Sequence, residues 1–189
     1  MLDAETILVA TEDVLRRHGP SKATVVDVAR ALGVSHAAVY RHFASKAALR
    51  EAVTRRFVGR TLPALEAIAA DAALAPPQRL RAWISAMFAA KRAAAGGDPE
   101  LFATYRALAG ESSTVAAEHV AALLSQLERM VADGIATGDF AATDAAAAAR
   151  AIFWATAAFH DPAHAGEWDR PGREAVLADV CTLVVNGLR

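Results

Sequence analysis

The sequence predicts an all-α fold with about nine helices, and three observations indicate this class. Apolar residues recur three and four positions apart along most of the chain, which is the spacing of one face of a helix. No segment shows a convincing alternation of apolar and polar residues, the pattern of a half-buried strand. Alanine, the strongest helix former, is abundant, and most β-branched residues lie within helical patterns.

The first predicted helix ends at Gly19-Pro20, because proline interrupts a helix and glycine readily adopts the backbone of a helix end. Two short helices are expected next. Thr24 and Ser35 are their candidate N-caps, since each hydroxyl can accept a hydrogen bond from a backbone N–H of the first turn, and Gly33 lies between them. Ser45 precedes a longer helix that continues into the sixties.

The middle of the chain predicts three further helices. Pro76-Pro77 opens a helix with one broad apolar stripe, formed by Leu80, Trp83, Ile84, Met87 and Phe88. The segment Gly96-Gly97-Asp98-Pro99 predicts a loop, and a short helix follows to about Leu108. A long helix is expected from Ser112 to about Thr137, and Gly138 can end it.

Two last helices complete the predicted fold. Thr143 is expected to cap a helix that runs through five alanines at 145–149 to Phe159, and Asp161-Pro162 breaks it. After Pro171-Gly172, a final helix carries a broad apolar stripe of Leu177, Val180, Cys181, Val184 and Leu188. A helix that is apolar on more than one face needs more than one neighbour. We therefore expect these two helices to form half of a four-helix dimer interface.

Composition excludes several classes of protein. With 54% apolar and 22% charged residues, the chain is not disordered over most of its length. The longest stretches without Asp, Glu, Lys or Arg, 31–40 and 151–160, have about half the length of a membrane-spanning helix. Acidic residues occupy the first positions, where a secretory signal carries Lys or Arg, and the single Cys181 cannot form an internal disulfide. We expect a soluble protein of the reducing cytoplasm.

The net charge of −1 is unevenly distributed. Residues 1–56 hold nine Lys and Arg against six Asp and Glu, a charge of +3, and residues 57–189 hold eleven against fifteen, a charge of −4. A basic first third favours binding of a polyanion at that end of the chain.

Residues 24–43 predict two short helices around a tight turn. The inward positions of this helix–turn–helix are Val28, Leu32, Val39 and Phe43. Ala29 supplies the small side chain that crossing helices need, and Gly33 can take the positive φ of the turn. No acidic residue occurs from Val28 to Arg50. The pattern indicates a second helix that enters the major groove of DNA, with an ordinary helical corner as the alternative.

The segment from about Ile7 to Val53 resembles the tetracycline-repressor (TetR) family of bacterial transcriptional regulators. The residues that carry the resemblance are Ala10, Gly19, Thr24, Val28-Ala29, Gly33-Val34-Ser35, Tyr40-Arg41-His42-Phe43, Ser45-Lys46 and Leu49. The resemblance implies a DNA-binding domain at residues 1–50 and a larger regulatory and dimerisation domain at residues 51–189. It also implies a homodimer that pairs through its last two helices, binds a pseudo-palindromic operator and releases it when a small-molecule effector binds.

The resemblance implies DNA-binding roles for Thr24, Ser35, His36, Ala37, Tyr40, Arg41, His42 and Lys46. Thr24 would cap its helix and contact a phosphate, and Tyr40 and His42 would reach the sugar–phosphate backbone. Lys46 would bind a phosphate at a helix N-terminus, where backbone N–H groups also help. For Tyr40 and His42, packing between helices is the alternative.

The remaining outward positions of the second helix would face base edges. Arg41 could take a guanine through its O6 and N7 atoms, beside His36, and alanine methyls could pack on thymine methyls. Ala37 and Ala38 stand where many members of the family have Gly and Thr. Direct polar readout is then thin, so we expect DNA shape to contribute to the preference.

A switchable regulator needs a second site, for which the middle helices offer bulky and polar candidates. These are Trp83, Met87, Phe88, Phe102, Tyr105, Arg106, His119, Phe153, Trp154 and Phe159. Most of them are expected to be core residues. Arg106 could pair with an anionic group or form a surface ion pair with Glu100 or Glu111. A mostly apolar pocket would suit an aromatic or otherwise amphipathic small molecule.

Other chemistry finds little support in the sequence. His160 and His164 have a spacing that metal sites use, but Pro162 breaks the helix that would align them, so we expect a helix end with His160 near its C-terminal dipole. Cys181 is expected to be a buried packing thiol. No nucleophile–base pair, phosphate-binding glycine loop or paired carboxylates are apparent, so neither an enzyme nor a cofactor is expected.

Two competing hypotheses remain from the sequence. One is a dimeric DNA-binding regulator without an effector, whose C-terminal domain serves only dimerisation or partner recruitment. The other is a helical enzyme or sensor that has lost DNA binding. A filled core would favour the first, and a covered basic face would favour the second.

Overall fold

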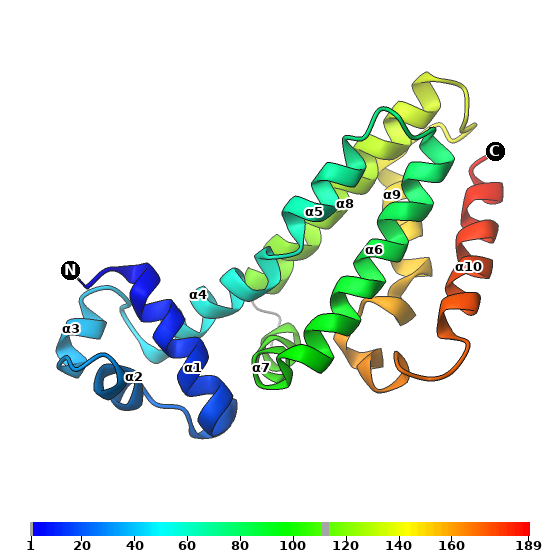
Figure 1. Ribbon diagram of the computed structural model, residues 1–189. Helices are drawn as coiled ribbons and strands as arrows, with labels where there is room; N and C mark the ends of the chain where they lie inside the picture. The colour runs from blue at the N-terminus through cyan, green and yellow to red at the C-terminus, as the bar shows by residue number, and fades with distance from the viewer. Residues whose placement is uncertain (1, 111–113) are drawn as a thin grey trace. The chain divides into compact units, whose positions relative to one another are not determined.

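A computed structural model describes residues 2–110 and 114–189, and this part of the chain contains helices and no strands (Figure 1). The predicted all-α class is therefore confirmed. In chain order the elements are α1 (Ala4–Lys22), α2 (Val25–Ala31), α3 (His36–Tyr40), α4 (Lys46–Gly59), α5 (Leu62–Ala69), α6 (Pro76–Gly97), α7 (Pro99–Gly110), α8 (Thr114–Ala136), α9 (Ala145–Ala155), the 3₁₀ helices η1 (Ala157–Phe159) and η2 (Pro162–Glu167), and α10 (Arg173–Gly187).

The contacts divide the chain into two compact units. Unit 1 consists of Met1–Arg60 and Ala94–Ala117, and unit 2 of Thr61–Ala93 and Glu118–Arg189. Helix α7 belongs to unit 1 because it packs on α1 and α4. The sequence-based division after residue 50 falls inside α4 and remains a prediction about function.

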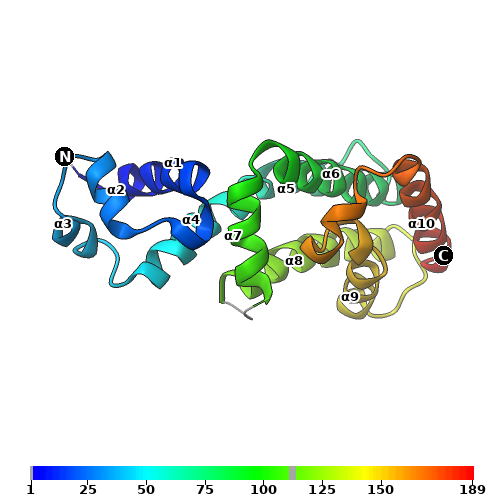
Figure 2. The same ribbon diagram turned by 90° about the horizontal axis from the view of Figure 1, so that it is seen from below.

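Unit 1 is built from well-capped helices. The carboxylate of Asp3 accepts a hydrogen bond from the Thr6 backbone N–H at 2.7 Å and begins α1. As predicted, the helical backbone of α1 is interrupted at Gly19, which has φ of +72°. Thr24 and Ser35 are the N-caps of α2 and α3, which confirms both predictions. In both views α1 to α4 lie together (Figures 1 and 2).

Unit 2 is a helical bundle around aromatic side chains. The predicted stripe of α6, from Leu80 to Phe88, is buried. Trp83 in this stripe donates its indole N–H to Gln126 of α8 at 2.8 Å, and Gln126 donates to the backbone oxygen of Leu62 beside α5 at 3.4 Å. Arg81 of α6 reaches Thr182 of α10 at 3.0 Å. Helix α6 therefore contacts both sides of the bundle (Figure 2).

Three predicted helix limits are wrong for local physical reasons. The N-cap of α9 is Asp144, whose carboxylate accepts from the Ala147 N–H at 2.9 Å, and not Thr143. The expected loop at 96–99 shrinks to one residue, because both glycines stay in the last turn of α6 and Pro99 begins α7. Helix α9 stops at Ala155, where the Thr156 hydroxyl donates to the carbonyl of Ile152 at 2.8 Å.

The predicted end of α8 is confirmed, since the helix stops at Ala136 and Gly138 has φ of +77°. Its expected start at Ser112 lies outside the described residues. None of the helices in the described part of the chain has both the length and the apolar character to cross a bilayer.

Gly134 allows the buried ring of Phe140 to pack directly on α8. A Cβ at position 134 would lie 2.1 Å from Cδ2 of this ring. We therefore expect Gly134→Ala to lower the free energy of unfolding by about 1–3 kcal/mol, because the overlap outweighs the roughly 1 kcal/mol that alanine adds in helix propensity. Urea unfolding measures the change.

Gly96→Ala is the matched control, because a Cβ there meets no atom within 4 Å. This variant should be as stable as the original chain or more stable. Equal changes in the two variants would contradict the close packing of Phe140 on Gly134.

Candidate functional site

The helix–turn–helix predicted from residues 24–43 is present in unit 1. Helices α2 and α3 meet through buried Val28, Ala29 and Val39, each at most 3% exposed. Gly33 has φ of +66°, as the tight turn requires, and the Val34 N–H donates to the carbonyl of Ala29 at 3.0 Å. Apolar packing and the glycine turn therefore fix α3 against α2.

All the residues predicted to contact DNA have exposed side chains. The structure brings them together at the start of α2, along α3, in the turn after it and at the start of α4: Thr24, Ser35, His36, Ala37, Tyr40, Arg41, His42 and Lys46. Tyr40 is 43% exposed, and its ring meets the His36 ring edge to face at 6.3 Å. This exposure favours the DNA-contact hypothesis for Tyr40 and His42 over packing between helices.

The start of α4 suits an anion. Lys46 is its first residue, the first turn carries no acid, and the Ser45 hydroxyl accepts from the Ala48 N–H at 3.0 Å. The N-terminal end of a helix carries a partial positive charge from its backbone N–H groups. Lysine and helix end thus add to one positive field, which remains a predicted phosphate site.

Thr24 has less freedom than the sequence suggests. Its hydroxyl donates to the Asp27 carboxylate at 2.6 Å, and its backbone N–H donates to the same oxygen at 3.1 Å. These contacts hold the pKa of Asp27 below its ordinary value. The capping role of Thr24 is confirmed, whereas its phosphate role remains a prediction that would require one of these two donors to leave Asp27.

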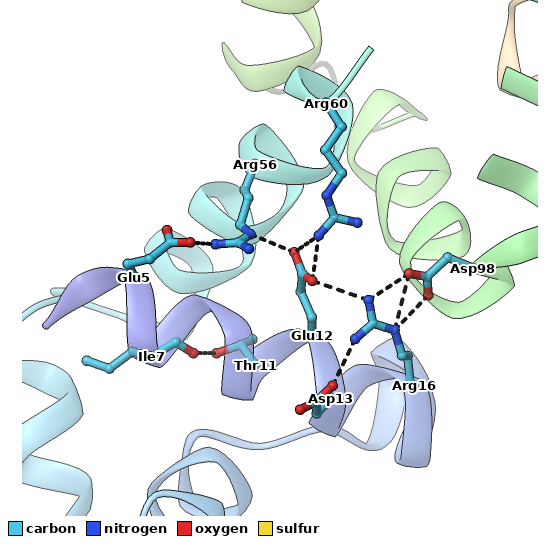
Figure 3. A network of polar contacts seen from close by, with 9 residues as sticks. All are labelled: Glu5, Ile7, Thr11, Glu12, Asp13, Arg16, Arg56, Arg60 and Asp98. Atoms are coloured by element: carbon cyan, nitrogen blue, oxygen red, sulfur yellow. Dashed lines mark hydrogen bonds and ion pairs between the residues drawn. The ribbon is translucent and has the colours of Figure 1, made fainter. Parts of the chain in front are cut away.

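Behind this surface, a buried carboxylate joins α1 to α4 and sequence reasoning missed it (Figure 3). Glu12 is 3% exposed and faces three guanidinium groups. The contacts are Arg56 Nε at 3.0 Å, Arg60 Nη2 at 2.6 Å and Arg16 Nη2 at 3.2 Å. An acid inside the buried stripe of the first helix, between Ile7 and Leu15, is the sequence signal that could have revealed it.

Arg16 extends this network to the residue before α7. Its Nη2 lies 2.8 Å from the Asp98 carboxylate and its Nη1 lies 2.8 Å from Asp13 (Figure 3). The Asp98 carboxylate raises the pKa of Arg16. Glu12 and Arg16 thus connect all three helices that support α2 and α3 within unit 1.

The predicted effector residues are divided between the two units. Buried in unit 2 are Trp83, Met87, Phe88, His119, Phe153 and Phe159. Phe102 and Tyr105 are buried in unit 1, with ring centroids 6.0 Å apart. Arg106 is exposed, and Trp154 is 63% exposed. The alternative partner of Arg106, Glu111, lies outside the described residues.

Unit 2 also holds a group that we call the basic cluster, which consists of Lys91, His119 and His160. All three are at most 5% exposed. Lys91 Nζ lies 2.9 Å from His119 Nε2, and His160 Nε2 lies 2.9 Å from the carbonyl oxygen of Phe153. Of the three, sequence reasoning proposed only His119 for the effector site.

The signal for Lys91 was present in the sequence. It follows Met87 by four residues and Phe88 by three, so it continues the buried stripe of α6. For His160, the expected place beside the end of α9 is confirmed by its contact with Phe153.

Burial governs the charge of this cluster. It lowers the pKa of His119 to about 3 and that of His160 to about 4, so both rings are neutral at neutral pH. Burial also lowers the pKa of Lys91, to about 8, which leaves the ammonium as the main form. The cluster therefore carries one buried positive charge between two neutral imidazoles.

Elsewhere in unit 2, Cys181 is buried as predicted, and burial raises the pKa of its thiol. Among the residues that the structure describes, no group of three His, Cys, Asp or Glu side chains could hold a metal ion.

Two family models match the sequence. The model described as "Bacterial regulatory proteins, tetR family" matches residues 7–53, and the model described as "Tetracyclin repressor-like, C-terminal domain" matches residues 76–181. No curated protein sequence matches the chain.

Several solved structures share the fold. A protein of unknown function from Rhodococcus sp. RHA1 has 24% sequence identity and a TM-score of 0.76, and the match covers 98% of this chain and 94% of that one. FadR from Bacillus subtilis, solved in complex with stearoyl-CoA, has 17% identity and a TM-score of 0.71, with coverage of 99% and 100%. SmeT, the repressor of the Stenotrophomonas maltophilia multidrug efflux pump SmeDEF, has 22% identity and a TM-score of 0.66, with coverage of 100% and 89%. These likenesses concern the fold.

Proposed function

We propose, for a chain that belongs to the TetR family of bacterial transcriptional regulators, that it is a ligand-responsive repressor which binds a pseudo-palindromic operator as a homodimer. Members of this family are DNA-binding regulators and not enzymes. The protein acts in the cytoplasm, where its operator is accessible.

The observation that supports this proposal most is the exposed face of α3 and the residues beside it. His36, Ala37 and Tyr40 lie on the helix itself, and Arg41 and Lys46 follow it, all exposed. No acidic residue lies between positions 28 and 50 to repel a phosphate. The arrangement lets α3 enter a major groove, with Arg41 toward base edges and Tyr40 and Lys46 toward the DNA backbone.

A dimer is proposed through α9 and α10. These helices carry large apolar side chains that are exposed in the single chain: Trp154 at 63%, Val176 at 48% and Leu183 at 72%. A second copy would cover them in a symmetric interface. The two α3 helices would then lie about 34 Å apart, which matches successive major grooves on one side of DNA.

The effector is proposed to act by shifting populations. It binds in unit 2, where six of the predicted effector residues are buried, and prefers the dimer form that does not fit the operator. A ligand that binds both forms equally well would not release DNA.

Selection of bound duplexes from a random pool tests the proposal. We expect an inverted repeat whose half-sites are centred about one helical turn apart, because two symmetric copies read it. Recovery of single, unpaired half-sites, or of no preferred sequence at low salt, would contradict it.

A dimer variant sharpens this test. Leu183→Asp places a charge in the proposed interface and should yield a monomer that loses the preference for inverted repeats. Asn186→Asp adds the same charge at another exposed position of α10 and serves as the control. Sedimentation measures the oligomeric state of both variants.

A further inference from the structure

The basic cluster draws its members from three separate parts of unit 2. Lys91 lies on α6, His119 on α8, and His160 directly follows η1. The 2.9 Å contact between Lys91 and His119 joins the two long helices in the interior of the bundle. A side chain that moved Lys91 would therefore act on α6 and α8 together.

Hydrogen-bond chemistry fixes the proton positions in the cluster. An ammonium group only donates, so Nε2 of His119 accepts from Lys91 and the ring carries its proton on Nδ1. The Phe153 carbonyl only accepts, so His160 carries its proton on Nε2 and donates it. The charged groups that act on Lys91 and the two rings are the members of the cluster themselves and Asp161.

Packing alone does not require a lysine at this position. Leu80, Ile84 and Met87 fill the same face of α6 with apolar side chains. A methionine in place of Lys91 would fill comparable space without the cost of removing an ammonium from water. A buried cation is also a strong point of attraction for an anion, because charges interact more strongly where water is excluded.

Aromatic side chains surround the cluster with apolar surface. Phe88 lies one turn before Lys91 and meets Phe159 and Trp168 edge to face, with ring centroids 5.6 Å and 6.4 Å away. The ring of Phe153 lies 4.3 Å from that of His160. Such walls suit a hydrocarbon or aromatic body attached to an anionic group.

From this geometry we infer that the effector is a carboxylic acid with an apolar body, whose carboxylate is held by Lys91 and His119. The inference rests on the proposed effector-responsive function and gives it a ligand class. A carboxylate fits better than a phosphate, because one ammonium faces the site, both imidazoles are neutral, and Asp161 adds a negative charge nearby.

The carboxylate and the imidazole have complementary roles. The carboxylate accepts from the Lys91 ammonium, and the Nδ1 proton of His119 becomes a second donor when the ring turns toward the ligand. An opposite charge beside Lys91 favours its protonated form, so ligand binding raises the pKa of Lys91 from about 8.

Calorimetry on the full-length protein without DNA tests this inference. Octanoate, dodecanoate and phenylacetate are each compared with the corresponding primary amide, which has the same body and no charge. We expect at least one acid to bind about tenfold or more tightly than its amide at neutral pH, because a charge-assisted hydrogen bond is lost in the amide.

A pair of variants on α6 locates the effect. Lys91→Met should reduce the preference for the acid to about twofold or less, since the cation is removed and the shape is nearly kept. Arg81→Met removes a cation from the same helix that contacts Thr182, and should keep the full preference.

Each outcome decides the inference. Equal binding of acid and amide, no binding of any of the three acids, or an undiminished preference in Lys91→Met would overturn it. The comparison in the unchanged protein holds even if a variant fails to fold. DNA binding is measured separately, so loss of the regulatory proposal with acid binding intact is distinguishable from failure of the carboxylate site.

Discussion

The double variant Tyr40→Phe, Lys46→Ala should bind its operator about a hundredfold more weakly at physiological salt and with a flatter salt dependence. Tyr40 loses a hydroxyl that is placed to donate to a phosphate, and Lys46 loses the ammonium at the start of α4. Each charge-assisted contact is worth about 1.5–3 kcal/mol, and every tenfold change in affinity corresponds to about 1.4 kcal/mol. Two protomers lose these contacts together.

Salt dependence separates this loss from a general weakening. A plot of log affinity against log salt should become shallower by about two, because each protomer neutralises one phosphate fewer. Fluorescence anisotropy at several salt concentrations measures both quantities. An unchanged slope would reject the phosphate roles, even if affinity fell.

The exposed Arg129 of unit 2 supplies the control. It pairs with Glu66 and lies outside the helix–turn–helix, so Arg129→Ala removes a positive charge without touching the proposed surface. Its binding constant and salt slope should stay close to those of the unchanged protein.

Removal of the Glu12 charge should cause the largest loss of stability. Glu12→Gln is expected to lower the free energy of unfolding by about 2–4 kcal/mol, because a buried carboxylate among three guanidinium groups is replaced by a neutral amide. The amide presents an N–H group to at least one arginine, which can only donate. The partial exposure of Arg16, Arg56 and Arg60 keeps the loss below that of a fully buried pair.

A matched exposed pair shows whether burial is the cause. Glu66→Gln removes the carboxylate that Arg129 contacts, where both side chains are about half exposed. Its effect should stay within roughly 0.5 kcal/mol, since exposed ion pairs contribute little. Denaturant unfolding of both variants measures the difference, and comparable losses would show that Glu12 is no more than a surface contact.

The sequence predicted the elements whose signals are local. Gly19 and Gly33 adopt the positive φ values that their places in the chain indicated, and Thr24 and Ser35 cap the helices that they precede. These predictions succeed because a cap or a turn depends on few neighbouring residues. The outward side of α3 follows from the same periodicity.

Contacts between distant segments were beyond local patterns. Glu12 meets Arg56 and Arg60 across 44 and 48 positions, and Lys91 meets His119 across 28. Helical spacing shows that Glu12 and Lys91 lie on buried faces, but not which residue meets them there. Tertiary packing alone decides those partners.

Helix limits failed where two signals competed. Thr143 and Asp144 are adjacent candidate caps, and the carboxylate formed the hydrogen bond. The two glycines at the end of α6 weaken a helix without preventing it, so the proline at position 99 set the boundary.

The division of labour within α3 has a consequence for how such a regulator diversifies. Ala38 and Val39 hold the helix in place, whereas His36 and Ala37 beside them make no buried contact. Substitutions at exposed positions of this kind usually change stability by less than about 0.5 kcal/mol. A descendant gene can thus acquire a new target sequence through the outer residues while its architecture stays intact.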